Sequence, residues 1–183
     1  MPRITLITGD GDITPDRQAE VDAIRGTLGH LSGPFSVLLY SPGLAQKVME
    51  AGAHVRLKST LEAWQRELAI LVTATVKHSD YEWASHVEAG RTAGLAETVI
   101  EEVRHGRDAP ADAGEDVADI VTYVRQLVTD NRVGQAVYGR LEARHGERWL
   151  VELTATVGQY QYIATMLGAF EVEPGPGRER ILG

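Results

Sequence analysis

The sequence of 183 residues predicts an all-α fold. Apolar residues recur every three or four positions along most of the chain, as they do on one face of a helix. No two segments alternate apolar and polar residues as paired strands would, and no strand–helix–strand order repeats. With 43% hydrophobic residues the chain can bury a core, so we expect one domain over residues 1–183.

The N-terminal segment, residues 1–13, is rich in Gly and Asp and has no helical period. It therefore predicts an extended arm. The first helix should follow directly, because Thr14 can cap its start and Pro15 suits its first turn.

The next helix should begin at Ser41-Pro42, which repeats this pattern of a cap followed by proline, and should end near Gly52. The apolar run before it, residues 35–40, could be mistaken for a strand. Because the chain offers no partner run, we expect a buried irregular or helical segment there.

A long buried helix is predicted from Ser59 onward. Ser59 and Glu62 have the spacing of a capping box, in which each side chain satisfies a backbone N–H of the first turn. The run LAILVTATV that follows is apolar on all sides, so its period alone does not exclude a strand. The length of the segment, its cap and its lack of Gly and Pro favour the helix.

The later helices are marked by Gly residues at their ends and by the loop GRDAPADAGED. The tail, residues 171–183, is rich in Pro and Gly, so we expect a surface extension or a strap onto another subunit. The later helices, which bring the total to about seven or eight, are expected at 80–93, 96–105, 115–130, 133–145 and 147–169.

A weak internal echo is also present. TATVKHSDYEWAS, residues 73–85, resembles TATVGQYQYIATM, residues 154–166. Such an echo can come from duplication of a helical hairpin or from two buried helices of similar composition, and both interpretations stay open.

The composition excludes several classes of function. A net charge of −8 argues against binding to nucleic acid or to an anionic membrane surface. No apolar stretch has the character of a signal peptide or a membrane span, so we expect a cytoplasmic protein. The chain has no cysteine, which removes disulfides, thiolate nucleophiles and thiolate metal sites together.

The segment KHSDYEWASHVEAG, residues 77–90, holds the strongest candidate for chemistry. Glu82 and His86 lie four positions apart, so on a helix their side chains share one face. A carboxylate beside an imidazole stabilises its protonated form and fixes its tautomer, which suits proton transfer near neutral pH. Glu67 lies inside the apolar run, where a carboxyl group must be paired, protonated or next to a cavity.

Two other interpretations of these residues stay open. An exposed Glu/His pair four positions apart is common and contributes only about 0.2–0.5 kcal/mol, and Glu67 could simply pair with an arginine at a helix contact. His78, Glu82 and His86 also recur at four-residue steps, as ligands of a metal would. We expect no metal, because His78 should lie at the end of the preceding helix and no fourth ligand is evident.

Several segments together carry a family resemblance. They are PRI near the start, GPFSVLLYSPGLAQKVMEAGAHVRLKSTL, RELAILVTATVKHSDYEWASHVEAGRTAGL, VTDNRVGQAVYGRLEARHGERWLVELTATVGQY and GAFEVEP, of which YEWASHVEAGRTAGL is the most specific. They resemble the carboxymuconolactone decarboxylase family, within the superfamily of alkylhydroperoxidase D-like proteins. The resemblance implies a compact helical bundle that assembles into a homo-oligomer, either a trimer or a hexamer.

The peroxidase branch of that superfamily has a signature of a Glu, two cysteines three apart, and a His four residues after the second cysteine. In this sequence Glu67 and His86 match the Glu and the His, but Ser79 and Glu82 stand at the cysteine positions. Neither residue can reduce a peroxide, so thiol-dependent peroxidase activity is excluded.

The resemblance then implies a cofactor-independent lyase or isomerase that acts on a small cyclic acid or lactone, as carboxymuconolactone decarboxylase does. His86 would be the general acid/base, with Glu82 or Glu67 as its orienting partner or as a second proton carrier. The alternative is a catalytically idle oligomeric protein that binds a ligand or serves as a scaffold. The residues expected to line the pocket are Ser79, Tyr81, Trp83 and His78.

The resemblance does not fix the substrate. A dianionic acid such as carboxymuconolactone would need an Arg or Lys in the pocket, for which Arg66, Lys77 and Arg91 are candidates. Cyclisation or dehydration in a biosynthetic pathway is a further reaction that the same pocket could support.

Overall fold

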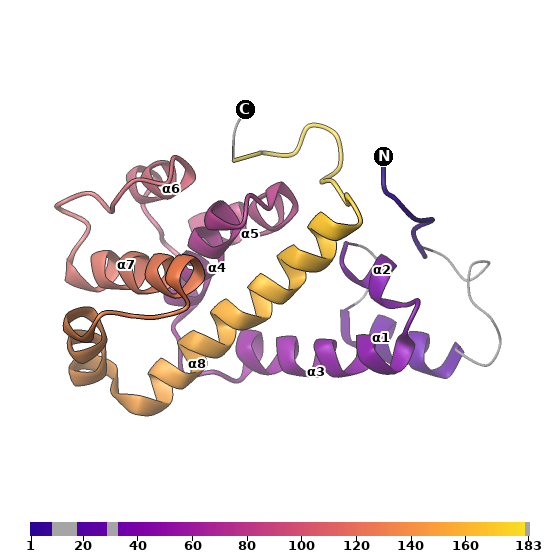
Figure 1. Cartoon of the computed structure of the whole chain (residues 1–183), viewed down its shortest axis with the longest axis horizontal. Coiled ribbons are helices and arrows are strands. Elements are labelled where there is room, and N and C mark those ends of the chain that lie inside the picture. The colour runs from indigo at the N-terminus through magenta and orange to yellow at the C-terminus, as the bar shows by residue number, and fades with distance from the viewer. Residues whose placement is uncertain (9–17, 29–32, 182–183) are drawn as a thin grey trace.

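The computed structural model describes residues 1–8, 18–28 and 33–181. Within this part of the chain every regular element is a helix, which confirms the all-α prediction (Figure 1). Thr14 and Pro15, the predicted start of the first helix, lie outside the described residues. The helices are α1 Gln18–Leu28, α2 Phe35–Leu38, α3 Pro42–Leu57, α4 Ala63–Val76, α5 Asp80–Thr92, α6 Glu97–Arg104, α7 Glu115–Asp130 and α8 Gln135–Ala169.

α3 begins at Pro42 with Ser41 as its N-cap, as predicted, but its C-terminal end differs from the prediction, whereas α5, α6 and α7 lie within about one residue of it. α3 continues through Gly52 to Leu57. A Cβ built at Gly52 would lie 3.1 Å from Nε2 of Gln159 on α8. This glycine therefore allows two helices to pack closely and does not end the helix.

The start of α4 corrects the predicted capping box. Ser59 does not cap α4, because its hydroxyl donates to the carbonyl of Val55 in the last turn of α3 at 2.8 Å. The capping box is formed instead by Glu62 and Gln65, and the backbone N–H of Glu62 donates to Oε1 of Gln65 at 3.0 Å. The helix consequently begins at Ala63, a full turn after the predicted position.

α8 is broken where the sequence predicts two separate helices. Gly146 has φ 81° and ψ 170°, which interrupts the helix between Gln135 and Ala169. Only glycine adopts this backbone conformation readily. The predicted boundary between 133–145 and 147–169 is therefore confirmed as a sharp kink.

The two echoing segments do not share a local structure. Residues 73–85 cross the junction between α4 and α5, where His78 has a positive φ of 52°. Residues 154–166 lie inside the continuous second part of α8. The similarity of the two segments therefore does not correspond to two copies of one helical hairpin.

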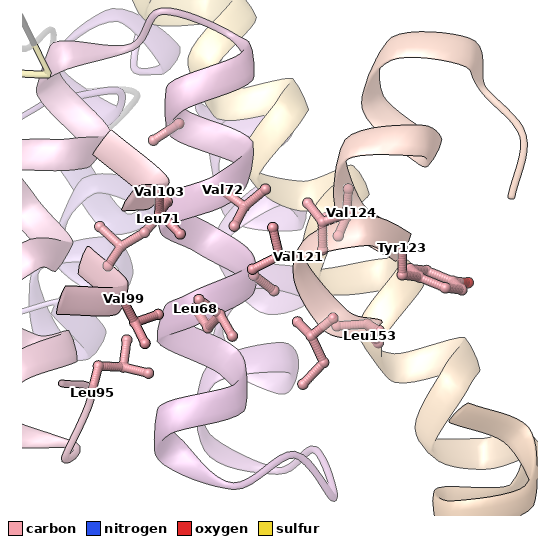
Figure 2. Close-up of a cluster of buried hydrophobic side chains, with 14 of the residues drawn as sticks. Leu68, Leu71, Val72, Leu95, Val99, Val103, Val121, Tyr123, Val124 and Leu153 are labelled. Carbon is pink, nitrogen blue, oxygen red and sulfur yellow. The ribbon is translucent and has the colours of Figure 1, made fainter. Parts of the chain in front are cut away.

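α4 lies at the centre of the larger of two apolar cores. Its side chains Leu68, Leu71 and Val72 point toward α6 on one side and α7 on the other, as Figure 2 shows. Leu153 of α8 joins the same cluster. Neighbouring helices cover the run LAILVTATV of α4, which accordingly lacks the polar stripe of a surface helix.

A second apolar core joins the N-terminal helices to the C-terminal part of α8. Ile7 of the N-terminal arm belongs to it, and its backbone N–H donates to the carbonyl of Ser36 at 2.9 Å. Since α8 contributes Leu153 to the first core and Leu167 to the second, it connects the two. Other members of the second core are Ile24, Val37, Leu38, Met49 and Ile163.

The C-terminal tail, expected as a surface extension or a strap onto another subunit, is mostly exposed and is tied to its own chain. Residues 172–181, here called the strap, run back past α5 (Figure 1). The backbone N–H of Ile181 donates to Asp80 at 3.0 Å, and Arg178 donates to the carbonyl of Ala84 at 2.7 Å. Ile181 is buried, so the strap is held by apolar packing as well as by hydrogen bonds.

No helix in the described ranges is long and apolar enough to cross a membrane.

Candidate active site

The centre of the site is a hydrogen bond between two neighbouring helices. Nδ1 of His86 on α5 lies 2.7 Å from Oε2 of Glu67 on α4. The exposed fractions of the two side chains are only 10% and 7%. Gly90 lets the helices approach here, because a Cβ built on it would lie 3.2 Å from Leu71 and 3.9 Å from Glu67.

Glu67 is held in its charged form. Burial would raise the pKa of this carboxyl, but the hydrogen bond with His86 and the positive charges of His86 and Arg66 outweigh burial and lower the pKa. Nε of Arg66 donates to Oε1 of Glu67 at 3.3 Å. The charged carboxylate accepts a hydrogen bond from the Nδ1–H of His86, which fixes the tautomer of the ring. The other ring nitrogen, Nε2, then faces the pocket residue Glu82.

Glu82 approaches the other nitrogen of the same ring. Its Oε2 lies 3.7 Å from Nε2 of His86, one helical turn away on α5. Burial raises the pKa of Glu82, and the positive charges of His86 and Arg56 offset this only in part. Glu82 therefore keeps its proton to a higher pH than an ordinary glutamate, whereas Glu67 loses its proton more readily.

A cavity of about 390 Å³ opens beside His86 and Glu82. It lies between α2, α3, α5 and α8, and its apolar wall residues Val48, Met49 and Ile163 belong to the smaller apolar core. This volume suits a small organic molecule. The lining residues are Pro34, Phe35, Val48, Met49, Gly52, Ala53, Arg56, Leu57, Tyr81, Glu82, Ser85, His86, Gln159, Tyr160 and Ile163.

Tyr160 of α8 closes the other side of the His86 ring. The two rings meet edge to face, with centroids 4.9 Å apart and an interplanar angle of 89°. Burial raises the pKa of the Tyr160 hydroxyl, so the phenol stays protonated. It can therefore donate a hydrogen bond to a bound molecule, but it is not a base at neutral pH.

Arg56 of α3 supplies a positive charge to the pocket wall. Its charge acts on both Glu82 and Tyr160. Within residues 1–8, 18–28 and 33–181, no side chain forms an ion pair or hydrogen bond with its guanidinium. Its side chain is exposed.

The structure brings Glu67, Glu82 and His86 together, and of the expected lining residues it places Tyr81 in the pocket. The other three lie elsewhere. Ser79 is the buried N-cap residue of α5, and His78 is exposed in the turn before it. Trp83 belongs to the larger apolar core, where its ring faces Arg104 at 5.4 Å.

The position of His78 separates it from Glu82 and His86, the other two residues considered as metal ligands. The helix is interrupted between Val76 and Asp80, so His78 does not continue the face of α5 that carries Glu82 and His86. In the portion of the chain that the structure describes, no group of three His, Cys, Asp or Glu residues could hold a metal ion.

Three polar pocket residues lie on helices for which the sequence predicted no part in the site. Arg56 comes from α3, and Gln159 and Tyr160 come from α8. One signal was present in the sequence: Gln159 and Tyr160 lie within the segment that echoes residues 73–85. The echo, however, gave no indication that this part of α8 packs against α5.

The comparison with protein families agrees with the predicted resemblance. Residues 42–126 match the model of the carboxymuconolactone decarboxylase family. This range contains Arg56, Glu67, Glu82 and His86 but ends before Tyr160. No curated protein has a sequence that matches this chain.

Two solved structures have the same fold. A protein of unknown function from Agrobacterium tumefaciens, proposed to be the antioxidant defence protein AhpD, has a TM-score of 0.66 at 15% identity and covers 79% of this chain and 99% of its own. The alkylhydroperoxidase AhpD core of an uncharacterized peroxidase-related protein from Ralstonia eutropha has a TM-score of 0.72 at 14% identity. The match covers 96% of this chain and 93% of the Ralstonia chain. At these identities the likeness shows the AhpD-like fold and nothing about the reaction.

Proposed function

We propose that this chain, whose residues 42–126 match the carboxymuconolactone decarboxylase family, is a cofactor-independent lyase or isomerase that acts on a small cyclic acid or lactone. One observation carries the proposal. His86 is held by the charged Glu67 at Nδ1, and its Nε2 lies next to Glu82 at the wall of a cavity of about 390 Å³. This is the geometry of an oriented general acid/base.

The residues can perform a decarboxylation in two steps. The bond between the ring carbon and the carboxylate carbon breaks, carbon dioxide leaves, and the electron pair is delocalised into the unsaturated lactone. The carbanion then takes a proton from Nε2 of a protonated His86, and Glu82 or water returns a proton to that nitrogen. The lactone itself accepts the electron pair, so the step needs no cofactor. In an isomerisation, Nε2 would instead remove a proton from one carbon and return it to another.

A second candidate is a protein that binds a ligand without turning it over. The apolar character of most of the pocket wall favours this alternative, because residues such as Phe35, Met49 and Ile163 would bind a ring without any chemistry. In that case Glu67, Glu82 and His86 form a satisfied polar contact between helices.

Product screening with unsaturated lactone acids, carboxymuconolactone first, tests the two candidates. We expect the wild type to release carbon dioxide or to isomerise one of these acids. His86→Ala should lower kcat by about 10²- to 10⁴-fold, because it removes the proton carrier. Glu82→Gln should lower kcat by a smaller factor, because water can replace a second proton carrier.

His105→Ala is the matched control, since His105 is an exposed histidine outside the pocket, and its kcat should equal that of the wild type. Equal turnover in the wild type, His86→Ala and Glu82→Gln would remove the catalytic assignment. Binding of a lactone acid without turnover by the wild type would support the ligand-binding alternative.

A further inference from the structure

The cations that the sequence offered for the pocket are engaged or lie elsewhere. Arg66 donates to Glu67, and Arg91 pairs with Glu97 and Glu179. Lys77 is exposed at the C-terminal end of α4. None of the three lines the cavity.

Arg56 is therefore the one arginine or lysine among the described lining residues. Its guanidinium forms no ion pair with any side chain of the described residues. Its positive charge nevertheless acts to lower the pKa of Glu82 and of Tyr160, which line the same pocket. Arginines at a protein surface normally find a carboxylate or remain hydrated. Here a guanidinium that has no carboxylate partner among the described residues lies at the edge of the cavity that His86 also lines.

We propose that Arg56 is the carboxylate anchor of this pocket, and that the natural substrate is a ring-sized acid carrying one carboxylate. The inference rests on the proposed function, because it names the substrate class of the same site. A guanidinium binds a carboxylate through two parallel N–H···O bonds, which fixes orientation as well as position. The remainder of the molecule would then lie against the apolar wall and reach toward His86.

The walls disfavour a second carboxylate. The described lining contains no second Arg or Lys to neutralise it, and Glu82 contributes a carboxyl group of its own. An unpaired anion in a cavity walled mainly by apolar side chains loses hydration without compensation. A dianionic acid should consequently bind no better than its monoanionic analogue, which separates this pocket from one built for carboxymuconolactone.

Equilibrium binding measured by calorimetry tests the proposal without requiring turnover. The probes are benzoate, the neutral isostere benzamide, and the dianion isophthalate. With the wild type we expect benzoate to bind more tightly than benzamide, and isophthalate to bind no more tightly than benzoate. Arg56→Gln should weaken benzoate binding by about 10- to 100-fold and leave benzamide binding unchanged, and Arg56→Lys should restore part of the loss.

Arg132→Gln is the matched control, because it removes one positive charge from the loop between α7 and α8, outside the pocket. Its benzoate affinity should equal that of the wild type. The proposal is overturned if the wild type shows no preference for benzoate over benzamide, if isophthalate binds more tightly than benzoate, or if Arg56→Gln binds benzoate as the wild type does.

These outcomes can be distinguished from those that concern the reaction. Benzoate binding that depends on Arg56, without turnover of any lactone acid, would retain the anchor and reject the enzyme. Turnover that depends on His86, with a KM unchanged in Arg56→Gln, would retain the enzyme and reject the anchor.

Discussion

Two carboxyl groups with opposite pKa shifts flank a single imidazole at this site. Glu67 and Glu82 are both buried, and burial acts on both in the same direction. The difference arises from hydrogen bonding, because both His86 and Arg66 donate to Glu67 and no side-chain hydrogen bond lowers the pKa of Glu82. Glu67 accepts a hydrogen bond from His86 at 2.7 Å, whereas Glu82 lies 3.7 Å from the same ring and makes no hydrogen bond to it. A base and a potential acid thus stand on opposite sides of one proton carrier.

Replacing Glu67 tests its role as the positioning residue. Glu67→Gln removes the charge that holds the Nδ1 proton, so we expect kcat on a substrate found by the lactone screen to fall by about 10²- to 10⁴-fold, with little change in KM. Nitrogen-15 NMR of the His86 ring should show a change in the population of tautomers. Glu88→Gln, on the exposed face of α5, should change neither quantity. An unaltered tautomer in Glu67→Gln would refute the positioning role.

Glu82 predicts a pH dependence of stability. Burial raises its pKa in the folded state above the ordinary value of 4.5, so between the unfolded-state and folded-state pKa this carboxyl binds more protons in the folded protein than in the unfolded chain. The free energy of unfolding contributed by this group therefore falls as pH rises through that window. Glu82→Gln lacks this loss, so its stability relative to the wild type should be greater at pH 8 than at pH 4.

Urea unfolding of both proteins across this pH range measures the difference. Glu88→Gln again supplies the control, because its side chain is 79% exposed, and its difference from the wild type should vary less with pH. A difference between Glu82→Gln and wild type that is independent of pH would contradict the assignment of a raised pKa.

At the scale of the elements, breaks in helices decide where functional residues lie. The interruption between α4 and α5 lets Glu67 and His86 face each other from neighbouring helices, although they are 19 residues apart in the sequence. The kink at Gly146 redirects the chain before the part of α8 that carries Tyr160. Without that change of direction, the first part of α8 could not pack beside α7 while its second part reaches the pocket.

The kink predicts a contrast between two glycines of the same helix. Gly146→Ala should lower the free energy of unfolding by about 1–3 kcal/mol, because an L side chain is strained at φ 81° and ψ 170°. Gly158→Ala should instead leave stability unchanged or raise it by about 0.5–1 kcal/mol, since Gly158 is helical and a Cβ there meets nothing within 4 Å.

Thermal or urea unfolding of the two single variants measures this contrast. A Cβ at Gly146 also meets nothing within 4 Å, so its cost would come from the backbone alone. Equal effects of the two substitutions would show that the kink carries no backbone strain for an L residue.

At the scale of the molecule, the pocket lies where two separately packed regions meet. α4 to α7 and part of α8 enclose the larger core, whereas α1 to α3 and the C-terminal part of α8 enclose the smaller one. The apolar pocket residues Met49 and Ile163 also belong to the smaller core, and His86 comes from a helix of the larger one. The strap adds a further connection by binding to Asp80 at the start of α5.

The larger core should dominate global stability. Leu68 is fully buried, and Leu68→Ala should lower the free energy of unfolding by about 2–5 kcal/mol through lost burial and a residual cavity. Val151 is 68% exposed on α8, so Val151→Ala should change the free energy of unfolding by less than about 0.5 kcal/mol. Urea unfolding compares them, and a similar effect of both would contradict the central position of α4.

The fold class and most helix ends follow from local features of the sequence. Gly and Pro have local backbone requirements, so Pro42, Gly94, Gly106 and Gly146 mark ends and breaks wherever the chain goes. The capping box before α4 was misplaced because two overlapping patterns had similar local merit, and a contact of Ser59 with the end of α3 decided between them. The four-residue spacing of Glu82 and His86 was sufficient to place both on one face of α5.

Tertiary structure alone decided which partners and which walls the site has. His86 binds Glu67 at Nδ1 because α4 and α5 pack across Gly90, a contact that no local pattern specifies. Arg56 and Tyr160 reach the pocket from helices about 100 residues apart in the sequence. Helical periodicity determines which side chains share a face of a helix, but which residues that face contacts depends on how the helices pack against one another.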